Sequence, residues 1–97
     1  MSDQPASPIV VSHNLAEHRF EAQVDGHLAV VEYERDGTRL IMTHTFVPPE
    51  LRGRGIAEKL VRPALDYARN ERLTVVPACS YVAVFIQRHP EYQALVQ

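Results

Sequence analysis

The residues with the clearest chemical potential lie in one short loop, Arg52-Gly53-Arg54-Gly55. The loop follows an apolar run that Pro48 and Pro49 end, and an amphipathic helical pattern begins directly after it. Glycines let a backbone approach a ligand closely, and the free N–H groups at a helix N-terminus favour an anion. Arginine side chains add positive charge and forked donors that suit phosphate oxygens. The loop therefore predicts a phosphate or pyrophosphate site between a strand and a helix.

Cys79 and His44 are the candidates for chemistry. Cys79 follows Pro77 just past a short β-prone run and directly precedes a second helical pattern. Strand ends in an α/β sheet usually border the ligand crevice, and the positive end of a helix lowers a thiol pKa. His44 lies near the end of the neighbouring strand in the expected sheet, and a histidine beside a cysteine can act as its base. The structural alternatives are a small buried cysteine and a core histidine that alternates with Met42 and Phe46.

The composition argues against several other classes of protein. The chain has 97 residues, 45% of them hydrophobic, which suits one domain with one core. Its net charge of −2 argues against nucleic-acid binding. We find no apolar run of membrane-spanning length and no signal-peptide pattern, and the single cysteine cannot form an internal disulfide, so we expect a cytoplasmic protein. The histidines and the cysteine lack the paired spacing of a zinc site, so no metal is expected.

The elements that position these residues follow from the hydrophobic pattern. We expect a mobile leader at 1–8 and a single domain at 9–97, which starts with a short edge strand at 9–11 and a turn at 13–18. Three strands should follow at 19–24, 28–34 and 38–47. Asp25-Gly26 and Asp36-Gly37 are tight-turn signals between them, so these strands predict an antiparallel meander.

The second half of the chain predicts a βαβ unit and a final helix. Apolar residues recur every four positions over 55–70, which predicts a helix that packs on the sheet. A strand at 73–76 should lie parallel to the third strand, because a helix crosses over between the two. A helix is expected at 81–88 and a short helix or turn at 91–96. The order is β-β-β-α-β-α, an α/β fold with a mixed sheet.

The loop and this order of elements resemble the GNAT superfamily of N-acetyltransferases. Arg52-Gly53-Arg54-Gly55-Ile56-Ala57 matches the acetyl-CoA loop pattern Gln/Arg-x-x-Gly-x-Gly/Ala of that superfamily. The chain is most similar to the very small, single-domain GNAT-like acetyltransferases, over residues 9 to 97. The other matching pieces, in order, are Arg19-Phe20-Glu21, Val24-Asp25-Gly26, His44-Thr45-Phe46-Val47-Pro48, Pro77-Ala78-Cys79-Ser80-Tyr81-Val82 and His89-Pro90-Glu91-Tyr92.

The resemblance implies an acyltransferase that moves acetyl from acetyl-CoA to an amine. The acceptor would be a small molecule or a protein lysine or N-terminus, and the enzyme a monomer or homodimer. The main chain around Phe46 and Val47 would hold the pantetheine arm of CoA. Equivalents of Cys79 and His44 are the suspected active-site residues of the small family. The loop residues that would cradle the pyrophosphate are Arg52, Gly53, Arg54, Gly55, Ile56 and Ala57.

Two routes of transfer stay open at this point. In one, Cys79 takes the acetyl group and passes it to the amine. In the other, the amine attacks acetyl-CoA directly while His44 or water removes its proton. Tyr81 is close in sequence to the superfamily's leaving-group tyrosine but in a different register, which leaves the general acid unassigned. The alternative functions are a non-catalytic CoA-binding or regulatory module and a phosphate- or nucleotide-binding module.

Overall fold

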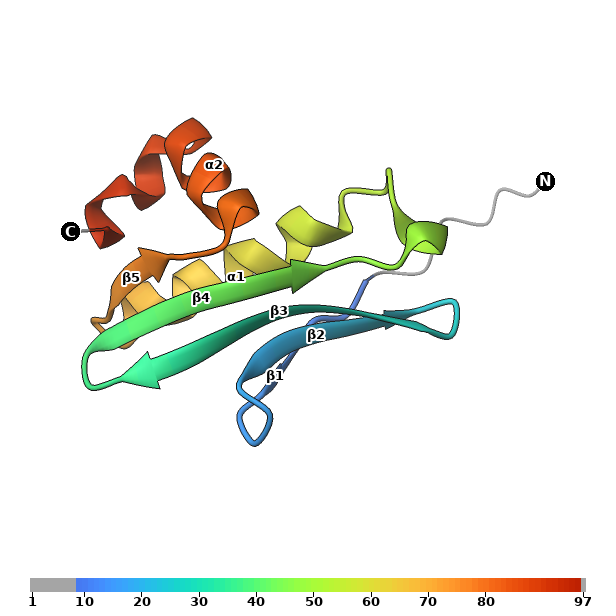
Figure 1. Ribbon diagram of the computed structural model, residues 1–97, viewed down its shortest axis with the longest axis horizontal. Coiled ribbons are helices and arrows are strands. Elements are labelled where there is room, and N and C mark those ends of the chain that lie inside the picture. Colours follow the sequence, from blue (N-terminus) through green and yellow to red (C-terminus); the bar gives the residue numbers. More distant parts are fainter. Residues whose placement is uncertain (1–8, 97) are drawn as a thin grey trace.

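Five strands form one mixed sheet in the computed structural model, which describes residues 9–96 (Figure 1). Across the sheet, neighbours from β1 to β4 pair antiparallel, and β5 pairs parallel with β4. The predicted meander followed by a βαβ unit is therefore confirmed, whereas the expected leader at 1–8 lies outside the described residues. In chain order and in sheet order the strands are β1 (Ser12–Asn14), β2 (Arg19–Val24), β3 (His27–Asp36), β4 (Arg39–Phe46) and β5 (Thr74–Pro77).

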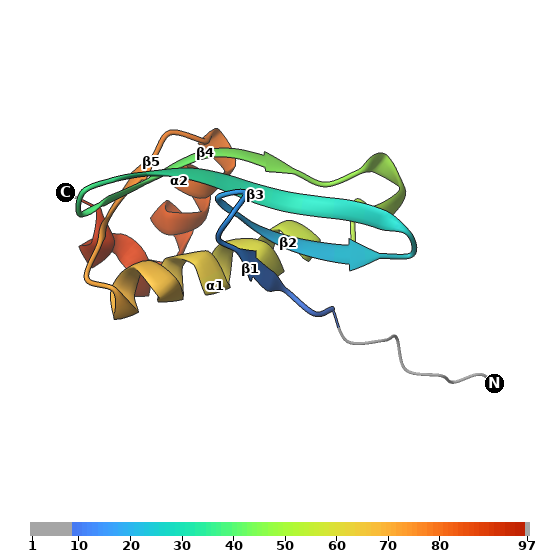
Figure 2. The same cartoon turned by 90° about the horizontal axis from the view of Figure 1, so that it is seen from below.

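The helices lie on one side of this sheet. Helix α1 (Ile56–Asn70) contacts β2 through β5, and α2 (Ser80–Arg88) lies against β4 and β5. Two short 3-10 segments, η1 (Pro49–Leu51) and η2 (Pro90–Leu95), precede α1 and follow α2. Figure 2 shows α1 and α2 below the sheet, and no helix of residues 9–96 covers its opposite face. We call that opposite side the open face.

Apolar side chains on the helix side form the core. Strand β3 contributes Ala29, Val31 and Tyr33, which alternate with residues of the open face. Full burial of one leucine side chain stabilises a fold by about 1.5–3 kcal/mol, so a buried stripe fixes α1 and the loop before it. The predicted stripe of α1 is confirmed by its buried residues Ile56, Leu60, Val61, Ala64, Leu65 and Ala68.

The edge strand differs from its prediction. It forms at Ser12–Asn14 and not at 9–11, and Val10 is 70% exposed. The ring of His13 stacks on Phe20 with centroids 4.0 Å apart, and its Nε2 lies 2.6 Å from the hydroxyl of Tyr33. These contacts bind the polar strand β1 to the rest of the sheet. A search for apolar patterns in the sequence cannot find them.

The second hairpin turn is shifted by one residue. Asp25 and Gly26 both have positive φ (52° and 78°), as an Asp-Gly hairpin turn requires. In the next hairpin Asp36 pairs with Arg39, so the two turn residues are 37 and 38, whereas Asp36-Gly37 was expected.

Candidate functional site

Strands β4 and β5 part in the middle of β4. The last parallel pair joins Met42 to Pro77, whereas β4 continues to pair with β3 as far as Phe46. The amide of Cys79 donates to the carbonyl of Met42 at 2.9 Å and closes one end of the gap. Beyond that point, in the described chain, residues 43–46 have no strand on the β5 side. Backbone groups along this edge are available to an extended ligand that carries amides.

A β-bulge at Thr43 sets the direction of the side chains that follow. Met42 pairs with Tyr33 and His44 pairs with Glu32, so Thr43 has no partner in β3. One extra residue reverses the alternation of faces. Thr45 therefore points to the helix side, and His44 points to the open face. The expected alternation of His44 with Met42 is wrong for this reason, and His44 is exposed.

Cys79 is half-buried at the N-cap of α2, as its position before a helix predicts. Its Sγ lies 3.4 Å from Oγ1 of Thr45. Burial raises the pKa of the Cys79 thiol, but the hydrogen bond with Thr45 and the nearby backbone amides of Val82, Tyr81 and Thr45 lower it by more, so the pKa lies below its ordinary value. The Cys79 side chain accepts no capping hydrogen bond from the first turn of α2, but the positive field of these backbone amides favours the thiolate form.

The structure does not bring His44 and Cys79 together as a hydrogen-bonded pair. Among residues 9–96 no hydrogen bond joins the imidazole of His44 to the sulfur, and the ring stacks toward Phe46 with centroids 6.5 Å apart. Thr45 makes the contact that was expected of His44. Alternation cannot reveal a bulge, so nothing in the sequence indicates this exchange beyond the polar run at 43–45 within an apolar strand.

The glycine and arginine loop borders a cavity of about 330 Å³. Gly55 is the N-cap of α1, with φ 72°, and no side chain caps the helix there. The first amides of α1 are therefore free to bind an anion. All the predicted loop residues except Arg54 line this cavity. Its lining is Val47, Leu51, Arg52, Gly53, Gly55, Ile56, Ala57 and Tyr81.

The two arginines of the loop have different partners. Arg52 donates from Nε to the carbonyl of Val47 at 3.0 Å and stays at the cavity. Arg54 forms an exposed ion pair with Asp25, 2.9 Å between Nη1 and Oδ2, in the β2–β3 turn. Arg52 therefore suits a ligand phosphate, whereas Arg54 ties the loop to the first hairpin.

The family model described as GCN5-related N-acetyl-transferase matches residues 19–95. The chain belongs to this family. Within residues 9–96 we find no helix long and apolar enough to cross a membrane, and no group of three His, Cys, Asp or Glu side chains that could hold a metal.

Curated and solved relatives agree with this GCN5-related assignment. Protein NATD1 of Bos taurus is 37% identical over 91 residues, which cover 91% of this chain and 80% of the relative. Protein NATD1 of Mus musculus is 35% identical over 95 residues, with 95% and 86% covered. A GCN5-like protein from Staphylococcus aureus, solved by NMR in solution, superposes with a TM-score of 0.75 at 26% identity and covers 94% of this chain and 90% of its own. The resemblance inferred from the sequence is thus confirmed for family and fold.

Tyr81 is a cavity residue of this GCN5-related domain that the sequence did not assign. It lines the loop cavity and also a smaller one of about 160 Å³ beside α2. Burial and the negative charge of Glu58 raise the pKa of Tyr81, so its hydroxyl keeps the proton and can donate a hydrogen bond. The other residues of the smaller cavity are Glu58, Val84, Phe85, Arg88 and His89.

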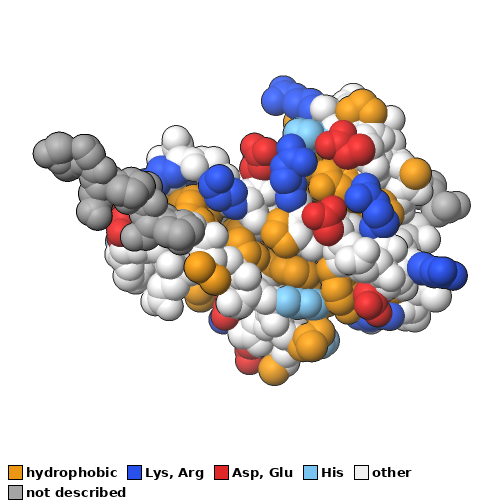
Figure 3. Space-filling model, turned by 180° about the vertical axis from the view of Figure 1, so that it is seen from behind, with side chains coloured by type: hydrophobic (Ala, Val, Ile, Leu, Met, Phe, Trp, Pro, Cys, Tyr) orange, Lys and Arg blue, Asp and Glu red, His pale blue; other side chains and the backbone are white. Residues whose placement is uncertain are grey.

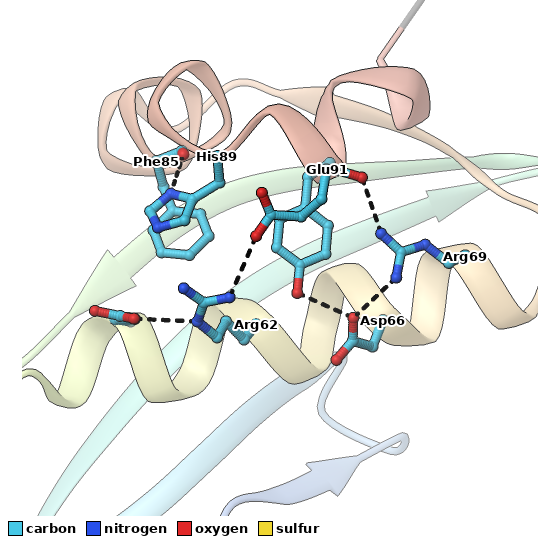
Figure 4. Close-up of polar contacts among 8 residues, drawn as sticks. Arg62, Asp66, Arg69, Phe85, His89 and Glu91 are labelled. Carbon is cyan, nitrogen blue, oxygen red and sulfur yellow. Dashed lines mark hydrogen bonds and ion pairs between the residues drawn. The ribbon is translucent and has the colours of Figure 1, made fainter.

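Polar contacts join η2, which follows α2, to α1 (Figure 4). Arg62 bridges Glu58 and Glu91, at 3.1 and 3.7 Å. Arg69 pairs with Asp66 at 3.6 Å and donates to the carbonyl of Glu91 at 3.0 Å. Figure 3 shows the resulting mixture of basic and acidic side chains on the helix side of the molecule. Exposed pairs contribute about 0–1 kcal/mol each, so they position η2 on α1 more than they stabilise it.

Proposed function

We propose that this GCN5-related protein is an acetyl-CoA-dependent N-acetyltransferase. The observation that carries the proposal is the continuity of three features along one path. Free amides of α1 and Arg52 border the loop cavity, Val47 of that cavity follows the unpaired edge of β4, and Cys79 lies where β4 and β5 part. A long ligand with a pyrophosphate, an amide-bearing arm and a reactive thioester fits these features in that order.

We assign separate roles to Cys79 and His44. In the covalent route the Cys79 thiolate attacks the thioester carbonyl, a new carbon–sulfur bond forms, and CoA leaves as a thiolate that takes up a proton. The amine then attacks the acetyl-cysteine, loses a proton to a base and releases the Cys79 thiolate. The lowered pKa of Cys79 favours this route. His44 lies on the open face, so we propose it as the base for the amine and not for the thiol.

Thermal unfolding with CoA, acetyl-CoA and ATP tests the ligand assignment. A ligand at a hundredfold its dissociation constant adds about 2.7 kcal/mol to the folded state. We expect CoA and acetyl-CoA to raise the midpoint and ATP to have no such effect. A shift by ATP that matches the shift by CoA would favour a nucleotide-binding module, and no shift by CoA would remove the cofactor assignment.

Intact-mass analysis after treatment with acetyl-CoA tests the covalent route. We expect one acetyl adduct on the wild type and none on Cys79→Ala. An unmodified wild type that turns over fully would leave direct attack as the route. Tight CoA binding without turnover of any amine would favour a regulatory module.

A further inference from the structure

Next to the bulge, the open face carries apolar side chains beside a carboxylate and an imidazole. Cross-strand partners point to the same face of a sheet, and Glu32 pairs with His44 while Val30 pairs with Phe46. Phe46 is 43% exposed and Leu28, two positions from Val30 on the same strand, is 37% exposed. We define the bulge surface as Leu28, Glu32, His44 and Phe46; Val30, which lies between Leu28 and Glu32 on β3, is buried at 7% exposure and adds little accessible area.

The carboxylate of Glu32 is available on this surface. Its cross-strand neighbour on β2 is Arg19, whose Nε is held by Glu21 at 2.7 Å and whose positive charge attracts the Glu32 carboxylate at longer range. Within residues 9–96 the side chain of Glu32 makes no hydrogen bond or ion pair, and only its carbonyl accepts a bond, from Thr43 at 3.3 Å. Glu32 is also half-buried, so water screens its charge less than that of an exposed carboxylate.

A free carboxylate beside exposed apolar side chains suits a cation on an alkyl stem. A lysine side chain has this form, since its methylenes can cover apolar surface while the ammonium meets the carboxylate. Leu28 to Glu32 spans four residue steps, about 13 Å along the strand, which is longer than one lysine stem. The bulge surface therefore has room for residues that flank the lysine in a polypeptide, and the cavities described above lie around the helices instead.

We propose that the bulge surface binds a lysine side chain of a polypeptide acceptor, with its ammonium on Glu32 beside His44. This inference rests on the proposed function and names its acceptor class. The ammonium gives one proton to the imidazole of His44, and the amine forms a carbon–nitrogen bond with the acetyl carbonyl at the gap between β4 and β5. The carbon–sulfur bond breaks, and the departing thiolate takes up the second proton that the nitrogen loses.

Binding without any cofactor gives the first test. The probe is the tripeptide Leu-Lys-Leu, blocked at both ends, added to ¹⁵N-labelled protein, and norleucine replaces lysine in the control peptide. We expect amide shifts at 28–32 and 44–46 that the norleucine peptide does not reproduce. Glu32→Gln should weaken binding about tenfold, as the loss of a hydrogen bond to a charged group does. Leu28→Ser should weaken it by a smaller factor.

Glu71→Gln provides the matched control, because it removes an equal charge at the C-terminal end of α1, away from the bulge surface. Binding by this variant should equal that of the wild type. Shifts that cluster on the helices, or equal affinity of wild type and Glu32→Gln, would overturn the proposal. This arm needs no acetyl-CoA, so its outcome is independent of whether CoA binds.

Steady-state kinetics gives the second test. At saturating acetyl-CoA, Glu32→Gln should raise KM for the lysine peptide about tenfold and leave CoA affinity unchanged. His44→Gln should lower kcat instead. Spermidine, or a peptide with a free N-terminus and no lysine, should be a poorer substrate than the lysine peptide. A preference for either of these amines would assign the surface to a different acceptor and overturn the proposal.

Discussion

The sulfur of Cys79 and the hydroxyl oxygen of Thr45 lie 3.4 Å apart at the point where β5 leaves β4. This contact exists because the bulge at Thr43 turns Thr45 toward the helix side. The same bulge moves His44 to the open face. One inserted residue thus separates the thiol from the imidazole and assigns them to opposite sides of the sheet.

Thr45→Val should make Cys79 less reactive. The hydroxyl of Thr45 is one of the groups that lower the pKa of the Cys79 thiol, so its removal raises that pKa and reduces the thiolate fraction at neutral pH. The rate of alkylation by iodoacetamide, measured against pH, should show its midpoint at higher pH than in the wild type. Thr74→Val is the control, since Thr74 lies on β5 before the gap and should leave the profile in place. Superimposable profiles for Thr45→Val and wild type would contradict the contact's role.

Arg52→Ala should weaken CoA binding far more than Arg54→Ala. Arg52 lies at the cavity, whereas Arg54 is paired with Asp25 outside its lining. Loss of a charge-assisted hydrogen bond to phosphate corresponds to about 1.5–3 kcal/mol, a tenfold or greater drop in affinity. Isothermal titration with CoA measures both variants. Equal losses would show that both arginines contact the ligand and that the Arg54–Asp25 pair opens on binding.

Much of the fold follows from local pattern. Apolar and polar residues alternate in β2 and β3, and apolar residues recur every four positions in α1. Each pattern marks the side of the element that contacts the core, so the sequence alone locates these elements. The loop of Arg52 to Gly55 is equally local, because glycine, arginine and a helix start suffice to predict an anion site. Arg52, Gly53 and Gly55 of this loop line the cavity, and the anion site itself stays a prediction.

The errors lie where distant contacts override the local pattern. His13 joins β1 because Phe20 and Tyr33 receive its ring, and these partners belong to other strands. His44 turns away from Cys79 because pairing with β3 leaves Thr43 as an extra residue. Register between strands is a property of the assembled sheet, and no alternation within one strand records it.

Gly55→Ala should affect both stability and CoA binding, and Gly37→Ala should affect stability alone. Both glycines have left-handed φ (72° and 60°), and an added Cβ would meet no atom within 4 Å at either one. The cost is therefore that of the backbone conformation, about 1–2 kcal/mol in urea unfolding for each variant. Only Gly55 caps α1 at the cavity, so only its substitution should displace the amides that we propose as pyrophosphate ligands. Unchanged CoA affinity in Gly55→Ala would argue against those amides as ligands.

His13 should make the stability of the domain depend on pH. Burial lowers the pKa of His13, so the unfolded chain binds this proton more readily than the folded one. The stability is then fully present above the unfolded pKa, about 6.5, and is lost as pH falls through the lower folded pKa. The groups around the ring are the hydroxyl of Tyr33, the rings of Phe20 and Tyr67, and, through the Tyr67 hydroxyl at 3.3 Å, Arg35.

His13→Phe keeps a stacked ring but cannot titrate. Its free energy of urea unfolding should therefore fall less between about pH 7.5 and about pH 5 than that of the wild type. This pH range spans the ordinary histidine pKa of about 6.5. His18→Asn is the control. His18 is exposed with φ 55°, a conformation that asparagine tolerates, and this variant should keep the slope of the wild type. A His13→Phe variant as sensitive to acid as the wild type would place the acid-sensitive group elsewhere in the domain. Since protonation places a charge on the partly buried ring of His13, which links β1 to the sheet, acid should release β1 before the other strands. Amide exchange in Ser12–Asn14 at pH 5 would reveal that release directly.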